Sequence, residues 1–296
     1  MTTTLKYSET FYSAQGEGHY IGVPSLWMRF FLCNLQCHGF GQIDPTNPDT
    51  YDLPYEKVDL TDITNVLDLP VFDKGCDSSY TWSRKYRHLI TDRSVEQAVD
   101  ELTALLPGGT FKHPKSGQWA HMVFTGGEPL LHTTQPGMVA VMHEFDRRGN
   151  LPRNVTVETN GTRELGDELA DFIDDFQFNR GGEWFWSISP KLWSTAGEQH
   201  KRAIKPAAVG RYAEVSPHGQ LKFVVNGSDA SWQEVEENVK LFRDAGCNFP
   251  VWIMGVGGTL EGLKITEAMI ADEAIQRGYN YTSRVHVHIY GNAIGK

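Results

Sequence analysis

Four cysteines are the side chains of this sequence with the most distinctive chemistry. Cys33 and Cys37 stand four residues apart in CNLQC, just past an apolar run, and thiolates so spaced on one loop can ligate a single metal centre. Cys76, in GCDSSYTW, is distant in sequence, but it can return to the pair because closing a long loop costs modest conformational entropy. Cys247 follows Gly246 beside another apolar run, and we expect it to be a packed core residue.

Three thiolates are compatible with two kinds of metal centre. A structural zinc site uses four protein ligands, and His38 could supply the fourth. An iron–sulfur cluster held by three thiolates instead leaves one iron open to a cofactor or a substrate. The spacing of the cysteines favours neither of the two.

Polar and glycine-containing motifs follow the predicted strands of the chain. Glycines permit tight turns, carboxylates and amides can hydrogen-bond a ligand, and a lysine offers a cation to a carboxylate. These candidate binding residues are Gly126, Gly127 and Glu128 in TGGEP, Glu158, Thr159 and Asn160 in ETN, and Ser189 and Lys191 on either side of Pro190.

Three further features are candidates for substrate binding. Gln15, Gly16 and Glu17 form a polar loop (QGEG) ahead of the first apolar run. Arg29 lies inside that run, and a buried arginine needs an anionic partner, which a substrate carboxylate could supply. His286 and His288 alternate with apolar residues in RVHVHIY, so both are expected on one face of a terminal strand, with His288 structural or facing solvent.

The elements that must position these residues alternate between strand and helix. Apolar runs of strand length predict strands at 23–31, 119–124, 154–158, 184–189, 220–225, 249–254 and 284–290, and helical periodicity falls between them, most clearly at 94–106. Ser231 with Glu234 resembles a capping box and predicts a helix from there to about residue 245. The alternation predicts an α/β fold with a parallel sheet. Motifs at the carboxyl ends of many strands favour a barrel-type site over a doubly wound sheet.

Composition sets the limits for the kind of protein this is. The chain has 296 residues, 40% apolar and 22% charged, and 27 basic against 37 acidic side chains give a formal net charge of −10, which disfavours direct nucleic-acid binding. No apolar run reaches the roughly 20 residues of a membrane span, and MTTTLKYSET lacks an apolar signal core, so we expect a cytoplasmic protein without membrane contact (host cytoplasm if viral).

We expect a single domain over residues 1–296 that contains an acidic insertion at 38–75. The insertion holds eight acidic residues against two lysines, a net charge of −6, together with four prolines, and its periodicity is poor.

Taken together, the motifs resemble those of the radical S-adenosylmethionine (SAM) superfamily and, within it, the 7-carboxy-7-deazaguanine synthases. The marks are YSETFYSAQGEG, WMRFFLCNLQC, CDSSYTW, TGGEPLL, VETNGT, ISPKL, QLKFVV and RVHVHIYGN, in family order and over nearly the whole chain. The family's run is CxxxCxxC, but here Phe40 stands at the third position. The simplest interpretation is that the insertion separates the second and third ligands, so that Cys76, followed by Asp77 and Ser78, completes the set.

The resemblance implies a fold, cofactors and site residues. The fold would be an incomplete (β/α)6 TIM-like barrel, and Cys33, Cys37 and Cys76 would hold a 4Fe–4S cluster. SAM would be bound by Gly126, Gly127, Glu128, Glu158, Thr159, Asn160, Ser189 and Lys191. Ser78 would offer its hydroxyl to Mg²⁺, a hard-oxygen ligand in place of the family's threonine. The substrate would be bound by Gln15, Gly16, Glu17, Arg29 and His286.

The implied activity is that of a carbon–nitrogen lyase. A SAM-derived radical would take a hydrogen from 6-carboxy-5,6,7,8-tetrahydropterin, and ring contraction with loss of ammonia would give 7-carboxy-7-deazaguanine, as in queuosine biosynthesis. The resemblance also implies a homodimer and an electron-donating reductase such as flavodoxin. Two alternatives stay open: an activase that installs a glycyl radical on a partner protein, and a non-catalytic or zinc-bearing binding protein on the same fold.

Overall fold

A single nine-stranded sheet organises the computed structural model, which describes residues 4–296. The strand order is β3-β1-β2-β4-β5-β6-β7-β8-β9, and from β2 onward every neighbouring pair is parallel. The strands are β1 (Thr4–Ala14), β2 (Pro24–Phe30), β3 (Thr91–Ser94), β4 (His121–Gly126), β5 (Asn154–Thr159), β6 (Glu183–Ile188), β7 (His218–Val225), β8 (Val251–Gly255) and β9 (Asn280–Tyr281). The predicted α/β class with a parallel sheet is therefore confirmed.

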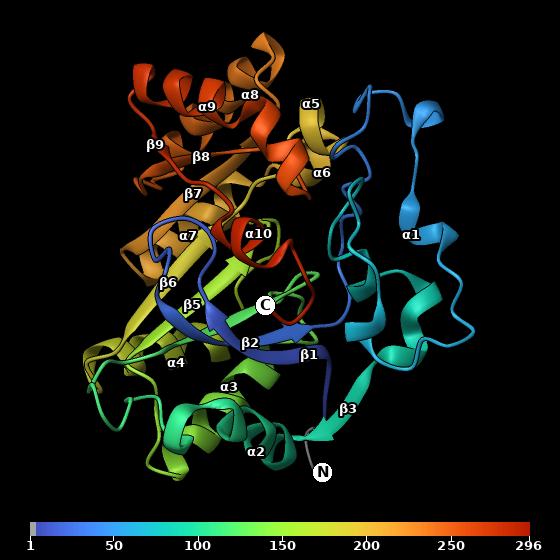
Figure 1. Cartoon of the computed structure of the whole chain (residues 1–296). Helices are drawn as coiled ribbons and strands as arrows, with labels where there is room; N and C mark the ends of the chain where they lie inside the picture. The colour runs from blue at the N-terminus through green and yellow to red at the C-terminus, as the bar shows by residue number, and fades with distance from the viewer. Residues whose placement is uncertain (1–3) are drawn as a thin grey trace.

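Helices follow the strands in chain order around the sheet (Figure 1). They are α1 (Pro54–Lys57), α2 (Val95–Leu105), α3 (Gln135–Arg147), α4 (Asp167–Phe178), α5 (Trp193–Ala196), α6 (His200–Ala203), α7 (Pro206–Val215), α8 (Asp229–Asp244), α9 (Leu260–Gln276) and α10 (Val285–Tyr290). Within the part of the chain that the structure describes, no helix is long and apolar enough to cross a membrane.

The two faces of the parallel strands have different chemistry. Alternate residues such as Phe124, Trp186 and Phe223 are fully buried in the main core with the helices. The residues between them, among them Thr125 and Lys222, line a cavity instead. Because side chains alternate across a strand, one face supplies the free energy of burial and the other is left for polar groups.

Segment 38–75 lies to one side of the sheet as a lobe of short helices and irregular chain (Figure 1). It has a small core of its own, in which Tyr55, Val66, Leu69 and Phe72 pack with the following segment at Tyr80, Tyr86 and Leu89. Its two ends meet at the base, where the Phe40 carbonyl accepts a hydrogen bond from the Gly75 amide at 2.7 Å. The insertion therefore ends close to where it begins, just before Cys76.

Two local expectations were wrong, and one long strand was missed. The run 284–290 forms the helix α10 and not a strand, and the two-residue β9 occupies the sheet edge beside β8. The N-cap of helix α8 lies three residues before the predicted one, because the side chain of Ser228 and not that of Ser231 accepts the capping hydrogen bond. Strand β1 was not predicted at all, although it pairs antiparallel with β2 over most of its length.

Candidate functional site

A cavity of about 270 Å³ lies at the carboxyl ends of the parallel strands. Side chains from β2, β4, β5, β6, β7 and β8 and from the loops after them line it, together with both ends of the insertion and the chain from Arg284 onward. All three predicted cluster cysteines, and all of the predicted SAM and substrate residues except Glu128, border this one space.

Cys33, Cys37 and Cys76 are free thiols on the cavity wall, and they pack together with Phe40. Burial raises the pKa of the Cys33 thiol to about 12 and that of Cys76 to about 11, since charged sulfur is poorly solvated there. Bound iron would favour the thiolates by supplying the missing positive charge. Three thiols that face one cavity, with Cys37 buried and the other two partly buried, fit an iron–sulfur cluster with one open iron.

The arrangement does not fit a single zinc ion. Among residues 4–296, no three His, Cys, Asp or Glu side chains are grouped closely enough to hold one metal ion together. His38, the candidate fourth ligand, instead stacks on Tyr55 and hydrogen-bonds its hydroxyl at 3.1 Å. A cluster of several irons is larger than one ion and accommodates wider spacing of the sulfurs.

The residues of the TGGEP turn do not all border the cavity. A Cβ on Gly127 would come within 2.2 Å of the Leu32 carbonyl oxygen, so glycine is required by the loop that leads to Cys33. Glu128 is fully buried and does not border the cavity. Its carboxylate accepts hydrogen bonds from the Leu130 and Asn160 amides, at 2.9 and 2.8 Å, and from the Thr159 hydroxyl at 2.7 Å.

Glu128 therefore fixes the turn after β4 to the turn after β5, and its side chain is not part of the cavity wall. Burial raises the pKa of Glu128, although its three donors oppose that shift.

The remaining predicted SAM residues do border the cavity. Lys191 hydrogen-bonds the Ser189 hydroxyl at 2.8 Å, and its ammonium lies 5.8 Å from the centre of the Phe40 ring. Glu158 accepts hydrogen bonds from Thr125 at 3.0 Å and from Gln15 at 3.3 Å. The lysine ammonium and the glutamate carboxylate place opposite charges in one cavity, which suits a zwitterionic ligand.

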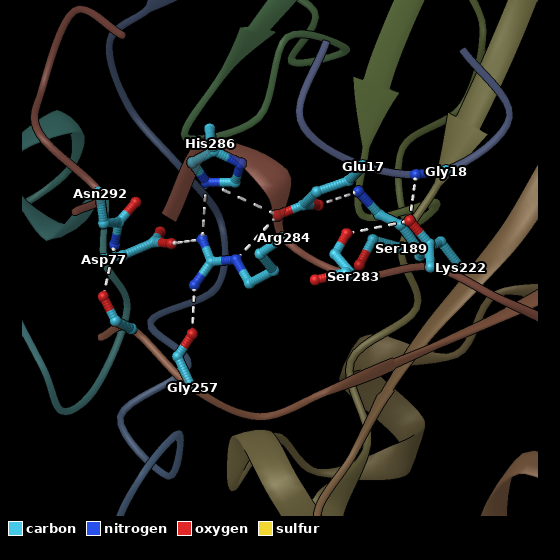
Figure 2. A network of polar contacts seen from close by, with 12 residues as sticks. Glu17, Gly18, Asp77, Ser189, Lys222, Gly257, Ser283, Arg284, His286 and Asn292 are labelled. Atoms are coloured by element: carbon cyan, nitrogen blue, oxygen red, sulfur yellow. Dashed lines mark hydrogen bonds and ion pairs between the residues drawn. The ribbon is translucent and has the colours of Figure 1, made fainter. Parts of the chain in front are cut away.

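In the same cavity, a charged network surrounds Glu17 (Figure 2). Glu17 pairs with Lys222 and with Arg284, the latter at 2.9 Å, and Arg284 continues to Asp77 at 2.6 Å. Burial alone would raise the pKa of Glu17, but the attraction of Lys222 and Arg284 outweighs burial and holds the pKa well below its ordinary value.

Sequence reasoning did not assign Lys222, Arg284 or Asp77 to the site. The available signal was a basic residue inside an apolar run, in QLKFVV and at the start of RVHVHIY.

Arg29 already has an anionic partner within the protein. Its guanidinium pairs with Glu9 at 2.6 Å, and the Tyr80 hydroxyl donates to the same carboxylate at 2.8 Å. The expectation that Arg29 needs a substrate carboxylate for its charge is thereby corrected, although Arg29 still borders the cavity beside Ser78, 3.5 Å away.

The two histidines of α10 separate because the segment is helical. His286 borders the cavity 4.0 Å from Glu17, and its ring leaves no room for a side chain at Gly16. Burial lowers the pKa of His286 despite the nearby Glu17 carboxylate. His288 lies away from the cavity, 3.3 Å from Glu267.

Comparisons with known proteins were made over the whole chain. No protein-family model matches it. The 7-carboxy-7-deazaguanine synthase of Rhodopirellula baltica is 27% identical, covering 99% of this chain and 89% of the relative. The synthase of Halobacterium salinarum is 28% identical over 98% and 91%, and that of Pyrobaculum aerophilum 26% over 100% and 99%.

A solved structure supports the fold. The crystal structure of QueE from Escherichia coli has a TM-score of 0.52 and 15% identity, and the match covers 96% of this chain and 95% of that one. The sequence matches confirm the resemblance that the motifs predicted: over nearly its whole length, this chain is similar to 7-carboxy-7-deazaguanine synthases.

Proposed function

We propose that this protein is a radical SAM lyase that converts 6-carboxy-5,6,7,8-tetrahydropterin into 7-carboxy-7-deazaguanine with loss of ammonia. The observation that carries the proposal is the meeting of Cys33, Cys37 and Cys76 on one cavity wall, in a chain similar to these synthases from end to end. The strand order supports an incomplete (β/α)6 barrel, with β2, β4, β5, β6, β7 and β8 as its six strands and 38–75 as an insertion within a single domain.

The residues of the chain would bind the cluster and SAM. The three thiolates would hold the 4Fe–4S cluster, and Lys191 would neutralise the carboxylate of SAM near the open iron. When bound, the cluster and SAM supply the radical chemistry that removes a hydrogen atom from the substrate. Glu158, Thr159, Asn160 and Ser189 would hydrogen-bond SAM, with Gly126 and Gly127 allowing its close approach.

The charged network around Glu17 suits a polar bicyclic substrate. Gln15 would donate and accept hydrogen bonds at the amide and amino edge of the pterin, and the Glu17 carboxylate would accept them there, with Gly16 leaving room for the ring. His286 and Arg29 would face its carboxylate, and Ser78 would offer its oxygen to Mg²⁺. The protein around Glu17 would exclude water from reactive intermediates.

We place the enzyme in the cytoplasm, with a flavodoxin-like reductase as its electron donor and a homodimer as its assembly. On the described surface, α9 exposes Ile265, Met269 and Ile275, which would be candidates for a subunit contact. Light scattering of the purified protein would test the dimer.

The test of the function is anaerobic incubation of the reconstituted protein with SAM, a reductant and the carboxypterin, followed by mass analysis. Formation of the deazaguanine without a partner protein excludes the activase alternative. Cys76→Ala should lose iron and activity, whereas Cys247→Ala, at a fully buried position outside the cavity, should keep both. Unchanged iron content in Cys76→Ala would remove Cys76 from the ligand set and favour a binding protein.

A further inference from the structure

The connection after β6 lies directly against the loop that carries Cys33 and Cys37. Three contacts join the two segments: the Ala196 carbonyl accepts from the Gly39 amide at 3.0 Å, Arg202 donates to the Asn34 carbonyl, and Glu198 lies between them. The connection, α5 to α6, therefore touches the cysteine loop along its length from residue 34 to residue 39.

Glu198 makes the most specific of these contacts. Its side chain is buried, and one carboxylate oxygen accepts hydrogen bonds from two consecutive amides, those of Gln36 at 2.6 Å and Cys37 at 2.8 Å. Hydrogen bonds from amides to a buried carboxylate are stronger than those between neutral groups.

The backbone at this point needs such support. Cys37 has a φ of +51°, in the left-handed region that residues with a side chain avoid, and Leu32 at the other end of the loop has a φ of +81°. This conformation is retained only when the surroundings determine it. The two amides bound by Glu198 are those of the strained residue and of its neighbour.

We propose that Glu198 is a positioning residue for the cluster: its carboxylate holds the Gln36–Cys37 backbone in the conformation that turns the Cys37 thiol toward Cys33 and Cys76. Because it lies beside that loop, its negative charge also favours the oxidised state of a bound cluster. The inference rests on the proposed function, since it assumes that these thiols hold iron.

Two substitutions separate the hydrogen bonds from the charge. Glu198→Gln keeps an oxygen that can accept from both amides, whereas Glu198→Ala removes it. After anaerobic reconstitution, the rate of iron loss to a chelator should rise about tenfold in Glu198→Ala and stay within about twofold of wild type in Glu198→Gln. In Glu198→Gln, the midpoint potential of the cluster, followed by electron paramagnetic resonance, should become more positive because a negative charge is gone.

The matched control is Glu144→Ala, which removes another mostly buried glutamate; Glu144 lies on α3 outside the cavity and pairs with Arg147 and with the C-cap residue Arg148. It should be destabilised without faster iron loss. Iron loss at the wild-type rate in Glu198→Ala, or equally fast loss in Glu198→Gln, would overturn the positioning role. If Glu198→Ala does not fold, an unchanged potential in Glu198→Gln still counts against the inference. Wild-type protein that takes up no iron would instead refute the proposed function.

Discussion

Asp77 and Arg284 are 207 residues apart in the sequence and form an ion pair of 2.6 Å. Asp77 directly follows the third cysteine, and Arg284 immediately precedes α10. The pair therefore joins the segment that carries Cys76 to the segment that carries His286. Figure 2 shows that Arg284 contacts Glu17 and Asp77 on opposite sides of its guanidinium. One guanidinium thus connects the neighbour of a proposed cluster ligand, Asp77, with the proposed substrate residue Glu17.

Asp77→Asn should lower the free energy of unfolding by about 1–2 kcal/mol, because the buried Arg284 loses one of its two carboxylate partners. The matched control is Asp92→Asn, which removes the exposed partner of Lys6 at 3.9 Å and should cost less than about 0.5 kcal/mol. Urea unfolding of the purified proteins measures both. Equal effects in the two variants would contradict a joining role for the Asp77–Arg284 pair.

Gly258→Ala should destabilise the protein and loosen the insertion. A Cβ at this position would lie 2.8 Å from the Phe72 carbonyl oxygen and 3.4 Å from the Cα of Asp73, so the insertion backbone must move, at a cost of about 1–3 kcal/mol. Limited proteolysis should then cut faster within residues 38–75. Gly262 lies in the first turn of α9, and a Cβ there would meet no atom closer than 3.4 Å. Gly262→Ala should therefore keep or slightly raise the stability, and the rate of cleavage should not increase.

The stability that Glu17 contributes should depend on pH with a definite sign. Its pKa in the folded protein lies below the ordinary value of 4.5, so its ion pairs with Lys222 and Arg284 stabilise the fold fully above that value and progressively less as the pH falls. Near neutral pH, Glu17→Gln should be about 2–4 kcal/mol less stable than wild type, and the difference should shrink below pH 4.5. Denaturant unfolding at several pH values tests this, and a difference that grows in acid would refute it.

Glu128→Ala should be costly for stability, because three donors lose their acceptor inside the protein. We expect about 2–4 kcal/mol, with Glu128→Gln intermediate since it keeps one acceptor oxygen. Thermal unfolding measures the loss. Glu214→Ala, at an exposed position paired with Arg211, should cost less than about 0.5 kcal/mol, and a similar loss in both would refute the role of Glu128 between the two turns.

Much of the sheet could be predicted because its strands are buried. The six parallel strands contain runs of β-branched and aromatic residues, and the structure has a strand within two residues of each predicted range. Strand β1 alternates polar and aromatic residues along TLKYSETFYSA, a weaker signal. At 284–290 a similar alternation led to the wrong prediction of a strand. Only Val287 of α10 is buried, and the tertiary contacts of Arg284 and His286 decide the helical conformation.

Side-chain contacts across the site were harder to predict. Glu234 fits a capping box with Ser231 in the sequence, but its carboxylate instead accepts hydrogen bonds from the amides of Trp193 and Ser194 at the start of α5. Glu9 gave no signal, yet it is the anion beside Arg29. Such pairings depend on distant segments that meet only after folding, and one chain's spacing carries no information about them.

The hydrogen bond between the Phe40 carbonyl and the Gly75 amide has a consequence for the history of this lobe. Because entry and exit are adjacent, residues between them can be gained, lost or exchanged while the thiol spacing stays constant. The position of Cys76 is thus set by the junctions of the lobe and by its packing against Gly258, and not by the number of residues between the junctions.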